Sequence, residues 1–261
     1  MRAKEFINEW FEPEFKNTKK TVAHDRMSLA KKAEKHKSGS YGYVTDTPND
    51  PGTVTKTQFD SDAGSTMSAY GKMDKPIDLY YVWVKMCSAD SNMAKNPYLP
   101  RVYVVDDRED INGQRMPRYK MEKLYSLSDE SINSEMLITI ARKIAISEDI
   151  IEDYTNNAIQ YAEDEGYDPG SIIKSQMIKL IIKHVHGIYY GDVSQYGNIS
   201  RAINMVYKIK KGFVEANLDM RKSNFMIRLT SVGPQLVFTD PIAGEVPFSR
   251  VQEFLKSEGI Q

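Results

Sequence analysis

Residues 217–242 read NLDMRKSNFMIRLTSVGPQLVFTDPI, and this stretch decides how the rest of the chain is interpreted. Asp219 lies five residues before Asn224, and Asp240 follows a strand–turn–strand pattern centred on a Gly-Pro pair. A carboxylate can orient an attacking hydroxyl and accept its proton, and further carboxylate and amide oxygens suit the Mg²⁺ ions that neutralise a triphosphate. The stretch therefore predicts a phosphoryl-transfer site built on a loop and on the end of a neighbouring strand.

The sequence before this stretch predicts a β-rich part. Residues 38–59 (SGSYGYVTDTPNDPGTVTKTQF) favour a hairpin with its turn in the Pro- and Gly-rich centre. Residues 101–106 and 118–124 favour two further strands. Residues 78–87 (DLYYVWVKMC) follow Pro76 and predict a helix that begins at this proline.

The pattern becomes helical after residue 124. Residues 136–165 carry apolar side chains at helical spacing with one break, and residues 171–190 and 200–216 predict two more helices. A β-rich first part, a helical second part and a late hairpin together predict an α+β protein in two lobes.

Composition and charge indicate a globular protein with two oppositely charged segments. The 261 residues are 41% hydrophobic and 27% charged, as in a globular protein with a real core. The net charge of −1 hides a local balance of +6 over residues 16–37 and of −8 over residues 144–173. These segments are interpreted as solvated helix faces, with a docking surface for a charged partner as the alternative.

The single cysteine, Cys87, excludes an intrachain disulfide and a multi-cysteine metal site. No apolar run is long enough to span a membrane, and the N-terminus lacks the apolar stretch of a signal peptide. We therefore expect an intracellular protein in a reducing compartment, without a membrane partner.

The deciding stretch resembles a known family. An Asp-x-x-x-x-Asn loop followed by an apolar strand and an aspartate is similar to the catalytic loop and metal-binding motif of protein kinases. The wording LDMRKSNFMIR…VFTDPI resembles the early serine/threonine kinases of autographivirus-type tailed bacteriophages. Those kinases carry Asp-Pro where most kinases carry Asp-Phe-Gly, as this chain does at Asp240-Pro241.

The resemblance continues upstream in the same order. The segment SGSYGYV, with Gly39 and Gly42, lies where a kinase has its glycine-rich loop over the ATP phosphates. Lys56 matches the lysine that binds the α- and β-phosphates. Asp78 is the expected acidic partner of this lysine, and Glu122 and Leu124 fall where the hinge meets adenine.

The resemblance also implies a role for each residue of the deciding stretch. Asp219 would orient the substrate hydroxyl and accept its proton, while Arg221 would stabilise the developing charge. Asn224 and Asp240 would hold Mg²⁺.

The fold implied is a bilobal protein-kinase-like one, with a β-rich N-lobe and a reduced helical C-lobe. We expect an N-terminal helical extension at residues 1–36, the N-lobe at 37–124 and the C-lobe at 125–261. The function implied is ATP- and Mg²⁺-dependent phosphorylation of serine or threonine in bacterial host proteins, in the host cytoplasm, during takeover. Transcription or translation proteins are candidate substrates, and we expect no nucleic-acid partner.

Departures from the family keep two other functions open. Asn217 stands where these kinases have a histidine, and no Ala-Pro-Glu motif follows Asp240. A catalytically inactive pseudokinase that inhibits a host protein by binding is one alternative. A small-molecule phosphotransferase of the aminoglycoside or choline type is the other.

Overall fold

The structure is a computed structural model that describes residues 37–39, 42–47, 49–58, 76–89, 95–107, 117–191 and 196–260. Its contacts divide the chain into two compact units, Met1–Lys37 and Ser38–Gln261. The helical extension predicted for residues 1–36 and the basic charges within it lie outside the described residues. Apart from Lys37, both predicted lobes fall within the second unit, and the boundary between them at residue 124 stays a prediction.

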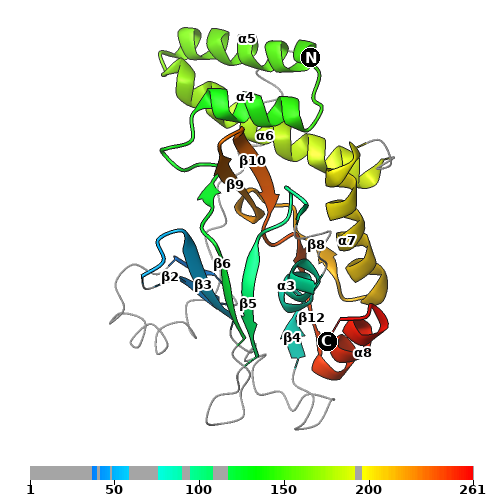
Figure 1. The fold of residues 1–261 in the computed structure, drawn as a ribbon. Helices are drawn as coiled ribbons and strands as arrows, with labels where there is room; N and C mark the ends of the chain where they lie inside the picture. The colour runs from blue at the N-terminus through cyan, green and yellow to red at the C-terminus, as the bar shows by residue number, and fades with distance from the viewer. Residues whose placement is uncertain are drawn as a thin grey trace, which may run out of the picture. The chain divides into compact units, whose positions relative to one another are not determined.

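The second unit combines helices with antiparallel sheets, which confirms the α+β class (Figure 1). The largest sheet has the strand order β1-β2-β3-β6-β5. Its strands are β1 (Lys37–Gly39), β2 (Gly42–Asp46), β3 (Thr53–Gln58), β5 (Val102–Asp106) and β6 (Arg118–Glu122).

Strands β2 and β3 form the predicted hairpin, with Val44 opposite Lys56. The turn between them is closed by a hydrogen bond from the Thr47 amide to the Thr53 carbonyl. Asn49 in this turn adopts a φ of 62°, a left-handed conformation that asparagine tolerates better than most residues. The polar turn residues therefore fix the register that places Lys56 in the middle of β3.

The predicted helix begins later than Pro76. Pro76–Asp78 form β4, which pairs with β12 (Glu245–Pro247), and α3 covers Tyr80–Ala89. The prediction that this helix starts at Pro76 was wrong, because pairing with a distant strand holds these residues extended. Asp78 instead begins the helix by accepting a hydrogen bond from the Tyr80 amide at 2.7 Å.

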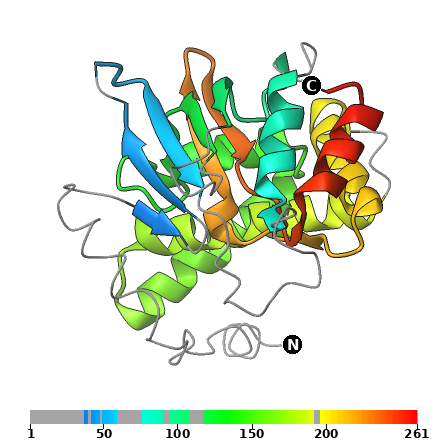
Figure 2. The same cartoon turned by 90° about the horizontal axis from the view of Figure 1, so that it is seen from below.

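Seven of the ten residues of helix α3 are buried, as expected of a helix that is mostly hydrophobic. It packs against β5 of the sheet, α7 (Asn198–Gly212) and α8 (Phe248–Ser257). Figure 2 shows α3 between the large sheet and these two helices. Trp83 and Val84 in its middle are completely inaccessible to solvent.

A second helical group consists of α4 (Ser134–Lys143), α5 (Glu148–Glu165) and α6 (Pro169–Tyr190). The break predicted within 136–165 is confirmed, because the chain reverses between α4 and α5, where Ala145 has a φ of 64°. The Asp168 carboxylate caps α6 by accepting from the Ser171 amide at 2.8 Å.

The deciding stretch forms short strands around a hairpin, as predicted. Its elements are β8 (Asn217–Leu218), the 3₁₀ turn η3 (Lys222–Asn224), β9 (Phe225–Thr230), β10 (Gly233–Phe238) and β11 (Ile242–Ala243). Strand β9 also pairs with β7 (Tyr125–Ser126). Lys143 of α4 donates to the carbonyls of Val232 and Pro234 and so holds α4 against the hairpin turn.

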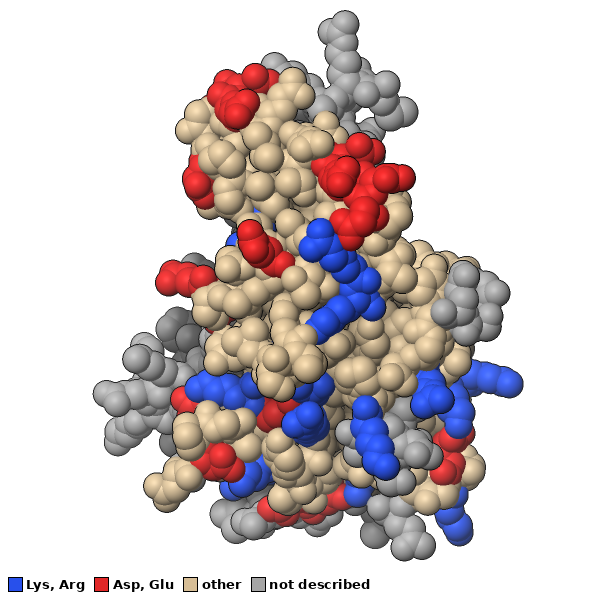
Figure 3. All heavy atoms as spheres, turned by 45° about the horizontal axis from the view of Figure 1, so that its top comes forward, with Lys and Arg blue, Asp and Glu red and all other residues tan. Residues whose placement is uncertain are grey.

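The acidic segment predicted from the sequence is a solvated face. The acidic side chains of α5 are exposed, and acidic residues gather over the helices drawn uppermost (Figure 3). Within the described ranges, no helix has both the length and the apolar character needed to cross a membrane.

A buried ion pair joins the large sheet to the β9–β10 hairpin. Arg228 of β9 pairs with Glu122 at the end of β6, and both side chains are less than a tenth exposed. Arg228 also donates to the carbonyls of Pro97 and Leu99 at 2.8 Å. The guanidinium is therefore fully engaged in a region where an unpaired charge would be costly.

We expect Glu122→Gln to lower the free energy of unfolding by about 3–5 kcal/mol, because it leaves a buried guanidinium without its counter-charge. Urea unfolding of the purified protein measures this loss. Glu148→Gln is the control, since Glu148 forms an exposed pair with Arg142 and its loss should be far smaller. Equal losses for the two variants would contradict the prediction.

Candidate functional site

Two loops of the deciding stretch are clamped together by a short ladder. Strands β8 and β11 are antiparallel, with Leu218 opposite Ile242. One residue further along, the Asp219 amide donates to the Pro241 carbonyl at 2.9 Å. The ladder therefore places Asp219 beside the Asp240-Pro241 segment.

Asn224 ties these loops together from inside. Its side-chain Nδ2 donates to the main-chain carbonyl of Asp219 at 2.9 Å. The main-chain carbonyl of Asn224 accepts from both the amide and the hydroxyl of Thr239. Asn224 is buried. The five-residue spacing of the loop therefore has a structural consequence, because it lets the asparagine close the loop on the aspartate.

The carboxylate of Asp219 is paired with Arg221. Nε and Nη2 of Arg221 donate to its two oxygens at 2.6 and 2.5 Å, a bidentate arrangement. The Asp219 side chain is 14% exposed, whereas that of Arg221 is 75% exposed. The two residues predicted to be catalytic thus lie in direct contact, with the cation on the solvent side.

Lys56 and Asp240, which are 184 residues apart, meet at the site. Lys56 Nζ lies 3.4 Å from Asp240 Oδ2, and the lysine side chain is 23% exposed. The predicted phosphate-binding lysine and the predicted metal ligand are therefore brought together. Asp240 is also close enough to Asp219 and Arg221 for their charges to influence it.

Burial raises the pKa of the Asp240 carboxyl above its ordinary value, while the charge of Lys56 opposes this rise and that of Asp219 adds to it. The side chain is 36% exposed, so solvent still reaches it. A nearby cation favours the ionised form of a carboxyl group whose pKa is raised by burial.

Asp78 does not have the partner that the sequence predicted. In the described part of the chain Lys56 forms its ion pair with Asp240 rather than with Asp78. The short Asp78 side chain turns back to cap α3, and it is only 7% exposed. The pKa of Asp78 is raised to about 7, chiefly by burial and also by the charge of Asp240, while the hydrogen bond from the Tyr80 amide and the charge of Lys56 act to lower it.

Sequence reasoning missed Tyr80 and Arg228. The Lys56 ammonium lies 3.2 Å from the centre of the Tyr80 ring, in the place where an acidic partner was expected. No pattern distinguishes Tyr80 from Tyr81 beside it. Arg228 could have been noticed, because a charged residue within the apolar run FMIRL falls at a buried strand position.

Glu122 and Leu124 lie at the end of β6 and just after it. The Glu122 carboxylate is engaged by Arg228, and its amide donates to the Arg101 carbonyl at 3.0 Å. Leu124 is half-buried. Contact of either residue with adenine stays a prediction. The Glu122 side chain is occupied by its ion pair with Arg228.

Gly39 ends β1 and Gly42 begins β2, and the residues between them lie outside the described ranges. Gly42 is opposite Gln58 in the β2–β3 ladder, two positions from Lys56. Their role over ATP phosphates stays a prediction. Asn217 is exposed and donates to the Glu215 carbonyl at 3.1 Å.

The side-chain oxygen atoms of Asn224 and Asp240 are of the chemical kind that Mg²⁺ prefers, and a shared magnesium site for them stays a prediction. Asn224 has committed its amide nitrogen to Asp219, which leaves its Oδ1 as a ligand atom that accepts only a long 3.3 Å bond from Ser223. Among the described residues no group of three His, Cys, Asp or Glu side chains could hold a metal alone. Magnesium at this place would therefore need phosphate oxygens as well, as is usual for nucleotide sites.

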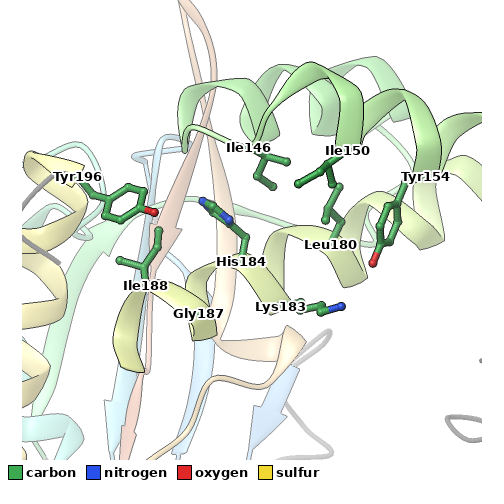
Figure 4. A pocket seen from close by; sticks show the side chains of 9 residues that line it. All are labelled: Ile146, Ile150, Tyr154, Leu180, Lys183, His184, Gly187, Ile188 and Tyr196. Carbon is green, nitrogen blue, oxygen red and sulfur yellow. The ribbon is translucent and has the colours of Figure 1, made fainter. Parts of the chain in front are cut away.

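A separate hollow of about 460 Å³ lies on the helical group, on different elements from the site. Figure 4 shows that α6 contributes much of its wall. The lining is mostly apolar and consists of Ile146, Ile150, Tyr154, Leu180, Lys183, His184, Gly187, Ile188 and Tyr196. None of these residues was predicted to be functional.

Comparison with known proteins adds no family to this description. No family model matches the chain, and no curated protein or solved structure matches it. Function is therefore inferred from the residues and their geometry.

The raised pKa of Asp78 predicts a pH-dependent stability. The folded protein holds this proton more tightly than the unfolded chain, where an aspartate titrates near 3.8. The Asp78 contribution to the free energy of unfolding is thus largest below pH 4 and is lost as the pH rises to about 7.

We expect Asp78→Asn, which keeps the oxygen that caps Tyr80, to be more stable than the wild type at pH 8 by up to roughly 4 kcal/mol. The difference should shrink towards pH 4, and urea unfolding at several pH values measures it. Asp168→Asn is the control with opposite sign, because the hydrogen bonds of Ser171 lower the pKa of Asp168. A constant difference between Asp78→Asn and wild type across this range would contradict the prediction.

Proposed function

We propose that this protein is an ATP-dependent phosphotransferase with a bilobal kinase-like fold, and that it phosphorylates serine or threonine side chains of proteins. The observation that carries the proposal is the contact of Lys56 with Asp240 at 3.4 Å. A strand lysine meets the aspartate of the Asp-Pro pair, next to a loop in which Asn224 closes on Asp219. Phosphoryl transfer uses such a lysine for the phosphates and such oxygen atoms for the metal.

In this mechanism Lys56 binds the α- and β-phosphates, and Asn224 and Asp240 hold Mg²⁺. When bound, the ion neutralises charge on the triphosphate. The Asp219 carboxylate orients the substrate hydroxyl and accepts its proton, which contributes on the order of 10²–10⁴-fold to the rate. Arg221 moves from Asp219 to the transferred phosphoryl group and stabilises its charge. The Arg221 side chain is exposed, which leaves it room to make this movement.

The substrates proposed are bacterial host proteins, phosphorylated in the host cytoplasm during phage takeover. The resemblance of the deciding stretch to the phage kinases supports this part of the proposal. The exposed acidic face of α5 also offers a surface that would steer a basic protein towards the molecule.

A second candidate is an ATP-binding protein that does not transfer phosphate. The bidentate contact of Arg221 with Asp219 favours it, because this contact occupies the proposed base. The chain after Asp240 also favours this candidate. It forms β11, β12 and α8, which pack against β4 and α3, where a kinase would have its activation segment.

The test is incubation of the purified protein with γ-labelled ATP, Mg²⁺ and bacterial lysate. We expect label on proteins and its loss, by 10²-fold or more, in Asp219→Ala. Lys56→Met should also lose transfer, whereas Lys120→Met should retain it. Lys120 is the matched control because it lies on neighbouring β6 and pairs with Asp50 away from the site.

The outcomes separate the candidates. Thermal stabilisation by ATP, without label on any protein, would identify the binding protein and contradict transfer. Stabilisation of about 2.7 kcal/mol is expected at an ATP concentration 100-fold above its Kd. Neither label nor stabilisation would overturn both candidates.

A further inference from the structure

The ammonium group of Lys56 lies over an aromatic ring. Its Nζ is 3.2 Å from the centre of the Tyr80 ring, which is close for a cation–π contact. Tyr80 is the first residue of α3 and is only 3% exposed. Because the ring is buried, this contact is better shielded from water than one at the surface, although the Lys56 side chain is 23% exposed.

The ring is held in place from two further sides. It meets Tyr119 edge-to-face, with centroids 5.5 Å apart and planes at 77°. Its hydroxyl donates to Met121 Sδ at 3.2 Å. Tyr119 and Met121 both lie on β6, the strand beside β3, and Tyr119 is the ladder partner of Lys56. The same strand therefore fixes both the lysine backbone and the ring under its ammonium.

The start of α3 fixes the backbone of Tyr80. The Asp78 carboxylate accepts from the Tyr80 amide at 2.7 Å, so the residue expected to pair with Lys56 instead orients the ring that contacts it. Burial raises the pKa of the Tyr80 hydroxyl well above its usual range, so the ring remains neutral.

We propose that Tyr80 is the positioning residue for Lys56, and that its ring face takes the place of a carboxylate partner in presenting the ammonium to a nucleotide polyphosphate. This inference rests on the proposed function. A neutral ring attracts the cation without adding another carboxylate beside Asp240 and Asp78, so less of the lysine charge is neutralised before the phosphates arrive. Asp240 can then exchange Lys56 for a metal ion while the ring keeps the lysine in place.

The test is a series of variants at position 80 whose affinity for Mg²⁺-ATP is measured by calorimetry. Tyr80→Phe keeps the ring and should bind within about twofold of the wild type. Tyr80→Leu removes the ring face and should weaken binding by about tenfold to thirtyfold. Tyr81→Leu is the matched control, because Tyr81 is equally buried on the same helix but its ring faces Lys85, whose ammonium lies 5.7 Å from the ring centre.

Fluorinated phenylalanines at position 80 separate positioning from packing. Stepwise fluorination weakens the negative ring face with little change in size, so the Kd for ATP should rise step by step. Packing alone would leave the Kd flat across the series, and a flat series would overturn the proposal while leaving ATP binding intact. This series also answers the question if Tyr80→Leu does not fold.

An ATP-independent measurement distinguishes failure of this inference from failure of the proposed function. Reductive ¹³C-methylation of the lysines gives an NMR signal for Lys56, assigned by its loss in Lys56→Arg. We expect an upfield ring-current shift that persists in Tyr80→Phe, disappears in Tyr80→Leu and is unchanged in Tyr81→Leu. If the shift is present but ATP does not bind, the contact stands and the phosphotransferase function fails; if the shift is absent from the wild type, the positioning role fails.

Discussion

The buried pair of Arg228 and Glu122 is the interaction on which the site depends most. It joins β9 to β6, and each of these strands pairs with a strand that positions one half of the site. Lys56 lies on β3, which pairs with β6, while Asp240 follows β10, which pairs with β9. The 3.4 Å contact between Lys56 and Asp240 therefore exists only where the sheet and the hairpin are correctly docked. A buried charge pair suits this task because it tolerates few alternative arrangements, even where it adds little net stability.

Two of the three carboxyl groups near the site form ion pairs, and the third is buried without one among the described residues. Asp219 pairs with Arg221 and Asp240 pairs with Lys56, whereas Asp78 is buried and has a pKa raised to about 7, so it is only partly ionised near neutral pH. A third ionised carboxylate at this place would repel Asp240 and, under the proposed function, the triphosphate as well. The neutral ring of Tyr80 therefore fits the local electrostatics better than an acidic side chain would. Its attraction for Lys56 needs no counter-charge.

Sequence patterns were sufficient for elements whose signal is local. The β2–β3 hairpin, the break before α5 and the β9–β10 hairpin follow from turn residues and apolar spacing, and all three are present. The start of α3 was wrong because Pro76 is a helix-start signal only when no strand pairs with it, and the partner β12 lies 169 residues further on, counting from Pro76 to Glu245. Strand β12 and helix α8 themselves were not predicted. The contact of Lys56 with Tyr80 also depends on tertiary packing, which no local pattern encodes.

The chain after Asp240 links the site to the core of the molecule. Strand β11 pairs beside Asp219, and β12 then pairs with β4, the strand that leads through Asp78 into Tyr80. Between them Gly244 has a φ of 141°, and a Cβ there would lie 2.6 Å from the Glu215 carbonyl oxygen, so only glycine lets the chain pass. Its carbonyl accepts from the Leu79 amide at 2.9 Å. Two short ladders therefore connect the segment that carries Asp240 to the start of α3, where the ring of Tyr80 contacts Lys56.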